Sequence, residues 1–183
     1  MEKLFFEFPT KKREKEAVEF IEEFIKYKSN INGTGGLDKM YHNYEKWLLK
    51  INNSLNKETV EPESVTASTY FVIREIDNKI IAMVNIRHYL NDDLLKHGGH
   101  IGFGVRPTER KKGYATELLK LALIKLNELG IQNALLTCDK SNIGSAKTIK
   151  NNLGILENEV LYQENEMLQR YWIDVKNAIK YKK

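Results

Sequence analysis

The stretch GHIGFGVRPTERKKGYATELLKLAL, residues 99–123, contains a strand, a loop and a long helix in immediate succession. In its first part Ile101, Phe103 and Val105 alternate with small or polar residues, as in a strand with one bulky face. From residue 113 to 129 apolar residues recur at helical spacing, and Gly130 then ends the helix. The apolar residues of this helix are Ala115, Leu118, Leu119, Ala122, Leu126 and Leu129.

The loop before this helix carries Arg110, Lys111 and Lys112 directly before Gly113. The first N–H groups of a helix have no intrahelical partner and lie at the positive end of its dipole, so an anion is favoured there. Gly113 lacks a Cβ and lets a phosphate approach the backbone, and Thr116 offers a hydroxyl one turn further on. The segment contains neither the P-loop pattern nor the glycine pattern of dinucleotide-binding proteins. We therefore expect a phosphate-binding helix terminus that differs from both.

Periodicity elsewhere predicts an α+β protein with helices and strands mixed along the chain. Strands are expected at 4–8, 69–76, 79–88, 100–105, 134–138, 153–163 and 167–176, and the second and third of these should form an antiparallel hairpin. Helices are expected at 10–27, 37–55, 113–129 and from about 141, with a flexible glycine-rich segment at 32–36. The length of 183 residues fits one domain that spans 1–183.

The composition excludes several classes of protein. Hydrophobic residues make up 42% and charged residues 30%, so the chain is neither disordered nor fibrous. The net charge of +4 is too small to require a nucleic acid as partner. Because no window approaches the roughly 18 apolar residues of a membrane span and no signal peptide is recognised, we expect a cytoplasmic protein without a membrane partner. One cysteine, Cys138, excludes an internal disulfide and a multi-cysteine metal site.

Two segments carry a resemblance to a known family. Arg110 to Ala115 fits the pattern Arg/Gln-x-x-Gly-x-Gly/Ala and resembles the pyrophosphate-binding signature of the GCN5-related N-acetyltransferases (GNAT). Asn142 to Ala146, directly after the predicted strand ALLTC, is similar to the family's second conserved block. The resemblance narrows to a group of bacterial predicted acetyltransferases that have no assigned acceptor. It implies a GNAT fold, in which a central mixed, mostly antiparallel β-sheet is flanked by helices on both sides.

The resemblance also implies that acetyl-CoA is the cosubstrate, without a metal, and that a core of about residues 79–160 binds it between the family's fourth and fifth strands. The acetyl group would pass directly, in a ternary complex, to an amine of a small molecule, a peptide or a protein. A homodimer is compatible with this interpretation. Loop chemistry and resemblance together assign these residues to the cofactor: Val105, Arg110, Lys111, Lys112, Gly113, Tyr114, Ala115, Thr116, Asn142 and Ser145.

An amine acceptor with a lysine-like pKa of about 10.4 is almost entirely protonated at pH 7, so a general base is expected. His100 stands where related enzymes often carry a carboxylate, on the strand face shared with Gly102 and Gly104, and we predict it to be this base. The alternative is a strand histidine that is exposed or merely hydrogen-bonded. His88 is the rival base, and Asp139 is a weaker one.

The leaving thiolate benefits from a general acid, which the resemblance places at Ile149, where the usual tyrosine is absent. Tyr162, Tyr171 or water would then supply the proton. A Cys138 acyl-enzyme is disfavoured because nothing near it in the sequence places a base beside the thiol. The acidic residues that would attract a cationic acceptor, unless they are simply solvated loop charges, are Asp92, Asp93 and Glu75.

Two other functions compete with this prediction. A non-catalytic acyl-CoA-binding or sensory module is favoured by the isoleucine at position 149. A nucleic-acid-binding protein would use the cations at 110–112 and the terminal KYKK, but the net charge is small and no array of aromatic residues lies between the cations.

Overall fold

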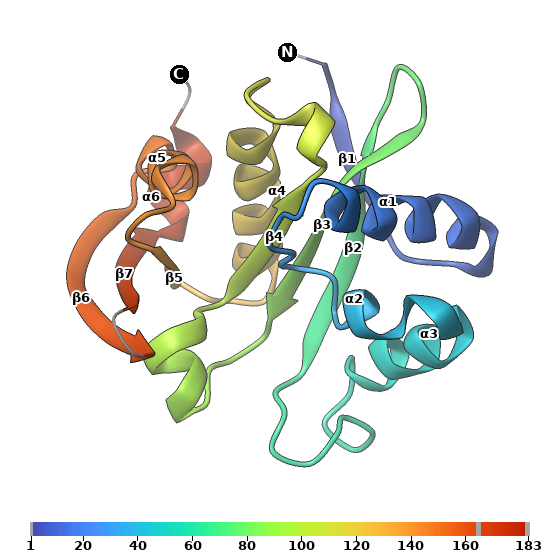
Figure 1. The fold of residues 1–183 in the computed structure, drawn as a ribbon. Coiled ribbons are helices and arrows are strands. Elements are labelled where there is room, and N and C mark those ends of the chain that lie inside the picture. Colours follow the sequence, from blue (N-terminus) through green and yellow to red (C-terminus); the bar gives the residue numbers. More distant parts are fainter. Residues whose placement is uncertain (1, 164–165, 182–183) are drawn as a thin grey trace. The chain divides into compact units, whose positions relative to one another are not determined.

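The computed structural model describes residues 2–163 and 166–181, and the chain forms two compact units. The first unit contains Met1–Ile86 and Gly102–Ala115, and the second contains Arg87–Ile101 and Thr116–Lys183. Each unit has its own β-sheet and its own helices (Figure 1).

The sheet of the first unit has four strands in the order β1-β2-β3-β4. Its strands are β1 (Leu4–Glu7), β2 (Ala67–Arg74), β3 (Lys79–Arg87) and β4 (Ile101–Val105). β1 runs antiparallel to β2, with Phe5 opposite Ile73. Residues 75–78 join β2 to β3, and Asn78 adopts a positive φ of 54°, as a tight turn requires. The predicted hairpin is thus confirmed, although its first strand begins and ends two residues earlier than expected.

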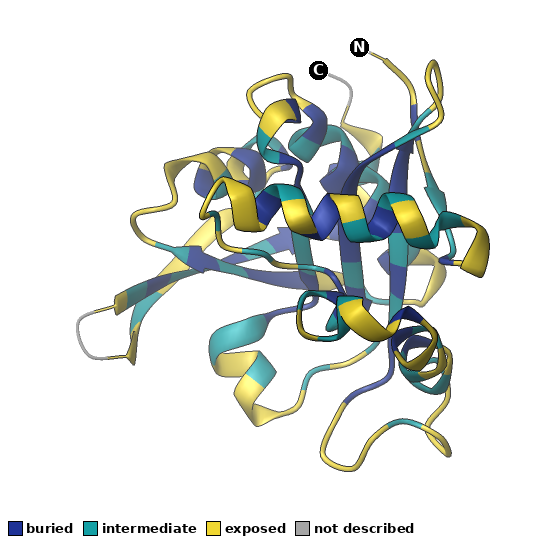
Figure 2. Cartoon of the chain, turned by 45° about the vertical axis from the view of Figure 1, so that its right-hand side comes forward, coloured by how far each residue is buried: buried dark blue, intermediate teal, exposed yellow. Residues whose placement is uncertain are grey.

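The helices of the first unit bury their apolar faces against β2 and β3. They are α1 (Glu14–Lys26), α2 (Leu37–Met40) and α3 (Tyr44–Asn53). The shared core contains Phe20, Phe24, Trp47, Phe71, Ile73 and Ile80, all fully or almost fully buried. Full burial of each such side chain stabilises the fold by about 1.5–3 kcal/mol. Figure 2 shows the resulting alternation of buried and exposed residues around the helices.

The prediction of one continuous helix over 37–55 is wrong. A 3₁₀ turn, Tyr41–Asn43 (η2), separates α2 from α3. The Asn43 side chain then accepts a hydrogen bond from the Lys46 N–H at 3.1 Å and so caps α3. A residue that can cap a helix start competes with its own place in a helix interior, which periodicity alone does not reveal.

The second unit has a three-stranded antiparallel sheet in the order β5-β7-β6. Its strands are β5 (Asn133–Asp139), β6 (Ile155–Gln163) and β7 (Glu166–Asp174). Leu136 of β5 lies opposite Tyr171 of β7. Helix α4 (Tyr114–Glu128) begins in the first unit and continues in the second from Thr116, and α5 (Ile143–Asn151) follows β5.

The end of the chain differs from the prediction. The last strand stops at Asp174 instead of continuing to 176. The Asp174 side chain accepts a hydrogen bond from the Asn177 N–H at 2.9 Å. This bond caps a short helix, α6 (Val175–Lys180), that was not predicted. The sequence predicts Leu129 on the apolar face of the helix over 113–129, but Leu129 lies beyond the end of α4 and is exposed. Within residues 2–163 and 166–181 no helix is both long and apolar enough to cross a membrane.

Candidate functional site

The loop that follows β4 is fixed at its start by Arg106. The side chain is buried, and its Nε donates to the Ile80 carbonyl at 2.6 Å. The Arg106 backbone N–H donates to the Ile81 carbonyl at 2.8 Å, and Nη1 pairs with Glu23 of α1 at 2.8 Å. A buried guanidinium with several partners is costly to displace. The contacts of Arg106 therefore fix the direction in which the loop leaves β4.

Glu23 also holds the next turn of the loop, Pro107–Glu109 (η4). Thr108 donates to Glu23 Oε1 from its backbone N–H at 3.0 Å and from its hydroxyl at 2.8 Å. Burial by itself would raise the pKa of Glu23, but the bonds from Thr108 and Arg106 outweigh it and hold the pKa below its ordinary value. Glu23 thus connects α1 to the loop as an ionised carboxylate.

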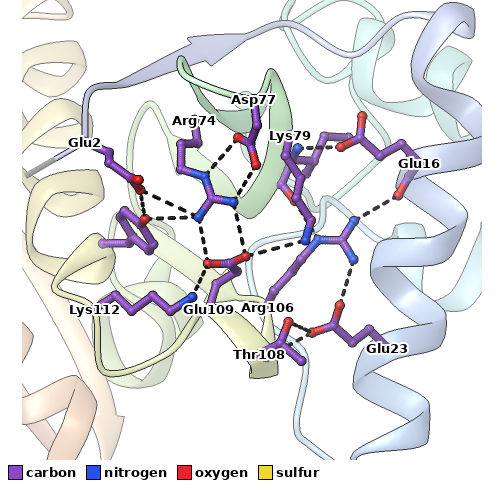
Figure 3. Close-up of polar contacts among 12 residues, drawn as sticks. Glu2, Glu16, Glu23, Arg74, Asp77, Lys79, Arg106, Thr108, Glu109 and Lys112 are labelled. Carbon is purple, nitrogen blue, oxygen red and sulfur yellow. Dashed lines mark hydrogen bonds and ion pairs between the residues drawn. The ribbon is translucent and has the colours of Figure 1, made fainter.

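Glu109 is the centre of a second ion cluster in the first unit (Figure 3). Its side chain is only 6% exposed and accepts from Arg74 Nη1 and Lys112 Nζ, each at 2.8 Å. Lys79 Nζ lies 3.5 Å from the other carboxylate oxygen. Burial would raise the pKa of Glu109, but the Lys112 and Arg74 bonds outweigh it and lower the pKa. The cluster ties the loop to β2 and β3.

We expect the Glu109→Gln variant to have a free energy of unfolding about 2–3 kcal/mol lower at pH 7, because Arg74 and Lys112 lose a buried anion. A carboxyl whose folded pKa is depressed stabilises the fold fully above its ordinary pKa of 4.5 and loses that contribution as the pH falls through the lowered value. The difference from wild type should therefore shrink below about pH 4.5. Urea unfolding between pH 2.5 and 7 measures it, with Glu22→Gln on the exposed face of α1 as control. A pH-independent difference would contradict this assignment.

Arg110, predicted to bind the cofactor, is turned toward the protein. Its Nη2 donates to the Ser29 hydroxyl at 2.7 Å, and its guanidinium lies over the Phe24 ring at 5.4 Å. Its Nε donates to the carbonyl of Val105, the other predicted cofactor residue at this end of β4, at 3.2 Å. Arg110 therefore supports the shape of the loop.

The end of the loop leads directly into α4. Lys112 pairs with Glu109, whereas Lys111 is exposed, with φ +63°, and has no ion pair within the part of the chain that the structure describes. Gly113 has φ +87°, a conformation that favours glycine, and α4 begins at the next residue, Tyr114. The unpaired first N–H groups of a 15-residue helix thus follow a rigid cationic loop.

Tyr114, Ala115 and Thr116 form the first turn of α4. The Tyr114 side chain is buried, and its hydroxyl accepts from Arg74 at 3.0 Å and donates to Glu2, so it anchors the turn. Only the backbone of Tyr114 is then available to a ligand of the loop. The Thr116 carbonyl accepts a bond from Asn152 Nδ2 at 3.1 Å within the second unit.

The glycine-rich segment 32–36 was predicted to be flexible, but it packs closely on β4. A Cβ on Gly33 would lie 2.4 Å from the Gly102 carbonyl oxygen and 2.5 Å from Phe103 Cα. A Cβ on Gly104 would lie 2.8 Å from the Asn32 carbonyl oxygen. The backbones of segment 32–36 and of β4 are therefore in close contact, and the glycines on both sides make this contact geometrically feasible.

His100, the predicted base, is 7% exposed and lies directly before β4. Its ring Nδ1 accepts a hydrogen bond from the Leu135 backbone N–H at 3.0 Å, and its backbone N–H donates to the Leu135 carbonyl at 2.7 Å. Burial lowers the pKa of His100 to about 4, and the Arg87 charge also lowers it, although the backbone contact with Leu135 opposes the shift. Burial also lowers the pKa of the rival base, His88. The base assignment stays a prediction, and the alternative of a hydrogen-bonded histidine describes the contacts that His100 makes.

The second predicted block lies at the start of α5, in the second unit. Asn142 Oδ1 accepts from the Ser145 N–H at 3.0 Å, so the asparagine caps the helix. Ile149, where the resemblance implies a tyrosine, is fully buried. The assignments of Asn142 and Ser145 to the cofactor also stay predictions.

Four other residues considered for proton transfer or acceptor binding have partners of their own. Tyr162 lies beside His97, with ring centres 5.2 Å apart, and Tyr171 is buried and donates from its hydroxyl to Gln169 at 2.6 Å. Asp93 pairs with His97 Nδ1 at 3.1 Å. In the first unit, Glu75 pairs with Lys3 at 2.9 Å. None of these roles is tested by these contacts.

Comparisons with known proteins bear on the whole chain. The sequence model described as "Acetyltransferase (GNAT) family" matches residues 37–155, more than half of the chain. The chain belongs to this family. No protein of curated function matches it. The predicted family, the α+β fold class and the N-acetyltransferase activity are therefore confirmed.

Solved structures agree with the fold of this acetyltransferase. The ribosomal-protein-S5-alanine acetyltransferase from Vibrio fischeri is 15% identical, with a TM-score of 0.71, and the alignment covers 95% of this chain and 94% of that one. A GNAT-family acetyltransferase from Bacillus anthracis is 16% identical, with a TM-score of 0.65 and coverage of 96% of each chain. The microcin C7 self-immunity acetyltransferase MccE, solved with acetyl-CoA and AMP, is 18% identical, with a TM-score of 0.66 and coverage of 92% and 91%.

We expect the acetyltransferase to work without its cysteine. Cys138 is buried, and burial raises the pKa of its thiol to about 11 although a bond to Ser145 opposes the shift. Only about one thiol in ten thousand is then ionised at pH 7. Cys138→Ala should keep the transfer rate within about twofold, and iodoacetamide should label the wild type about 100 times more slowly than free cysteine. An acetyl adduct on Cys138, detected by intact-mass spectrometry, would contradict direct transfer.

Sequence reasoning missed the residues that build the loop of the acetyltransferase. Arg106 and Glu109 lie inside the quoted stretch, yet their partners Glu23 and Arg74 are 83 and 35 positions away. The one available signal is that Arg106 directly follows the predicted strand 100–105, where a charge that becomes buried needs a partner. The identity of that partner follows only from the fold.

Proposed function

We propose that the chain transfers the acetyl group of acetyl-CoA directly to an amine in a ternary complex. Acetyl-CoA, when bound, supplies an acetyl thioester that an uncharged amine can attack. The observation that carries the proposal is the loop 106–113, held by two buried ion clusters in front of the first N–H groups of α4. A pyrophosphate fits this site because Gly113 has no Cβ and the helix terminus favours an anion.

The proposed contacts divide between backbone and side chains. The N–H groups of Gly113, Tyr114 and Ala115 would bind the pyrophosphate, and exposed Lys111 would add a charge-assisted bond. Arg110, Lys112 and Val105 would keep the loop in shape. Thr116, Asn142 and Ser145 stay assigned to the cofactor on the resemblance.

The acceptor is proposed to be an amine of a small molecule, a peptide or a protein. Similar folds include a ribosomal-protein alanine acetyltransferase and a spermidine N-acetyltransferase, 14% identical, whose names cover a protein amine and a polyamine. An amine must lose a proton before it forms the new C–N bond, and the departing thiolate of coenzyme A must gain one.

The proposal treats residues 1–183 as one acetyltransferase domain with an acetyl-CoA core at about 79–160. The match at residues 37–155 supports this because it includes parts of both compact units. We place the reaction in the cytoplasm, because a free thiol, here that of the buried Cys138, is typical of proteins in a reducing compartment. We propose neither a metal nor a nucleic acid as partner.

The experiment combines the full chain, acetyl-CoA and a panel of amines that contains spermidine and peptides with an N-terminal alanine. Thiol release and the mass of each product are recorded, and initial rates are measured at varied concentrations of both substrates. Intersecting double-reciprocal plots are expected for a ternary complex. Acetyl-CoA binding without transfer to any amine would favour the non-catalytic module, and parallel plots would favour an acyl-enzyme.

A further inference from the structure

His100 pairs with β5 through its side chain as well as its backbone. Its backbone N–H donates to the Leu135 carbonyl at 2.7 Å, and the Leu135 backbone N–H donates to the imidazole Nδ1 at 3.0 Å. In a regular strand pair both partners of Leu135 would be backbone groups. Here the Nδ1 of His100 takes the place of a carbonyl oxygen as acceptor. His100 therefore binds both the backbone N–H and the backbone carbonyl of Leu135.

This bond fixes the protonation state of the ring. A nitrogen that accepts an N–H bond has its lone pair occupied, so the single proton of the neutral His100 ring lies on Nε2. Burial keeps the ring neutral at pH 7, because it lowers the pKa to about 4. A general base needs a free lone pair that faces the proton it removes. In this arrangement neither ring nitrogen of His100 offers one.

Neighbouring groups fix the same segment of the second unit. Arg87 Nη1 donates to the carbonyls of Gly99 at 2.7 Å and Gly98 at 3.1 Å, and the Arg87 N–H donates to the His100 carbonyl at 2.8 Å. Gly99 has φ +69°, and a Cβ there would lie 2.5 Å from the Leu135 carbonyl oxygen. The segment before β4 is therefore held both by Arg87 and by the close approach of Leu135.

We propose that His100 is a positioning residue: its ring accepts the Leu135 N–H and so fixes β5 beside residues 99–100, and it is not the general base. β4 starts one residue later, at Ile101, and runs for five residues to the loop assigned to the pyrophosphate. An anchor at residue 100 thus sets where this short strand begins. The link to catalysis rests on the proposed function, whereas the hydrogen bond does not.

The first test is a long-range ¹H–¹⁵N spectrum of the histidine rings in the full chain at pH 7, with the His100 signals assigned from their absence in His100→Asn. The expected result is a protonated Nε2 and an unprotonated, hydrogen-bonded Nδ1. A proton on Nδ1 would overturn the proposal, because Nδ1 could not then accept from Leu135.

The second test compares His100→Asn, which places an acceptor oxygen near the position of Nδ1, with His100→Leu, which is apolar and has no acceptor. We expect the Asn variant to bind acetyl-CoA within about threefold of wild type in a calorimetric titration. The Leu variant should have an equilibrium constant for folding that is about tenfold smaller, and its Leu135 amide should exchange faster, because a buried N–H without a partner costs roughly the energy of a tenfold change. Circular dichroism checks that both variants fold.

The two roles of His100 predict different kinetics with any amine that the wild type acetylates. A positioning role predicts that His100→Asn keeps kcat within about fivefold. A base role predicts a kcat loss of about 10²–10⁴-fold in both variants at unchanged acetyl-CoA affinity, and this result would overturn the proposal. If the wild type does not bind acetyl-CoA, the proposed function fails, while the ring spectrum and the Leu135 exchange rate still decide whether His100 holds β5.

Discussion

The Gly33→Ala variant is expected to unfold with a free energy about 3 kcal/mol lower than that of wild type. Its new Cβ would lie 2.4 Å from the Gly102 carbonyl oxygen and 2.5 Å from Phe103 Cα, both backbone atoms of β4. Overpacking of this kind costs about 1–3 kcal/mol. The φ of +77° adds about 1 kcal/mol for any residue with a Cβ. Urea unfolding followed by circular dichroism measures the sum.

The matched control for this prediction is Gly130→Ala. Gly130 has the same φ of +77°, but no atom lies within 4 Å of the position of its Cβ. This variant should lose only the conformational contribution of about 1 kcal/mol. Equal losses at positions 33 and 130 would mean that segment 32–36 does not lie against β4 as described.

The Gly113→Glu variant is expected to bind acetyl-CoA at least about 100-fold more weakly than wild type. The new carboxylate would lie at the positive end of α4, where it competes with the pyrophosphate for the same N–H groups. Loss of two charge-assisted hydrogen bonds of about 1.5 kcal/mol each corresponds to this factor. Isothermal titration calorimetry measures the dissociation constant.

Gly130→Glu serves as the control for this substitution, because it introduces the same charge at a similar φ just beyond the other end of α4. Its affinity for acetyl-CoA should stay within about twofold of wild type. Unchanged affinity in Gly113→Glu, or an equal loss in the two variants, would show that the start of α4 is not the pyrophosphate site.

The elements around the opening stretch were predictable because local pattern decides them. β4 and α4 appear within one residue of the expected bounds, since alternation, helical spacing and the glycines near both helix ends all indicate the same boundaries. The break at Tyr41–Asn43 and the helix α6 were missed. Both depend on side-chain caps, by Asn43 and Asp174, that override the hydrophobic period.

The candidate site was predictable in its backbone and not in its side chains. Gly113 was expected at the helix start, and its positive φ agrees with the need for glycine there. Arg110 and Lys112 look like free cations in the sequence, but Arg110 donates to Ser29 of a distant segment, and Lys112 pairs with Glu109 of the same loop. Long polar side chains choose partners by proximity in the fold, which sequence spacing does not contain.

A crystal structure of the full chain with acetyl-CoA tests the central claim most directly. We predict that the pyrophosphate oxygens accept hydrogen bonds, at about 3 Å, from the N–H groups of residues 113–115, with Arg106 and Glu109 still in their ion clusters. A pyrophosphate bound elsewhere, with no contact to loop 106–113 or to the first turn of α4, would contradict the account.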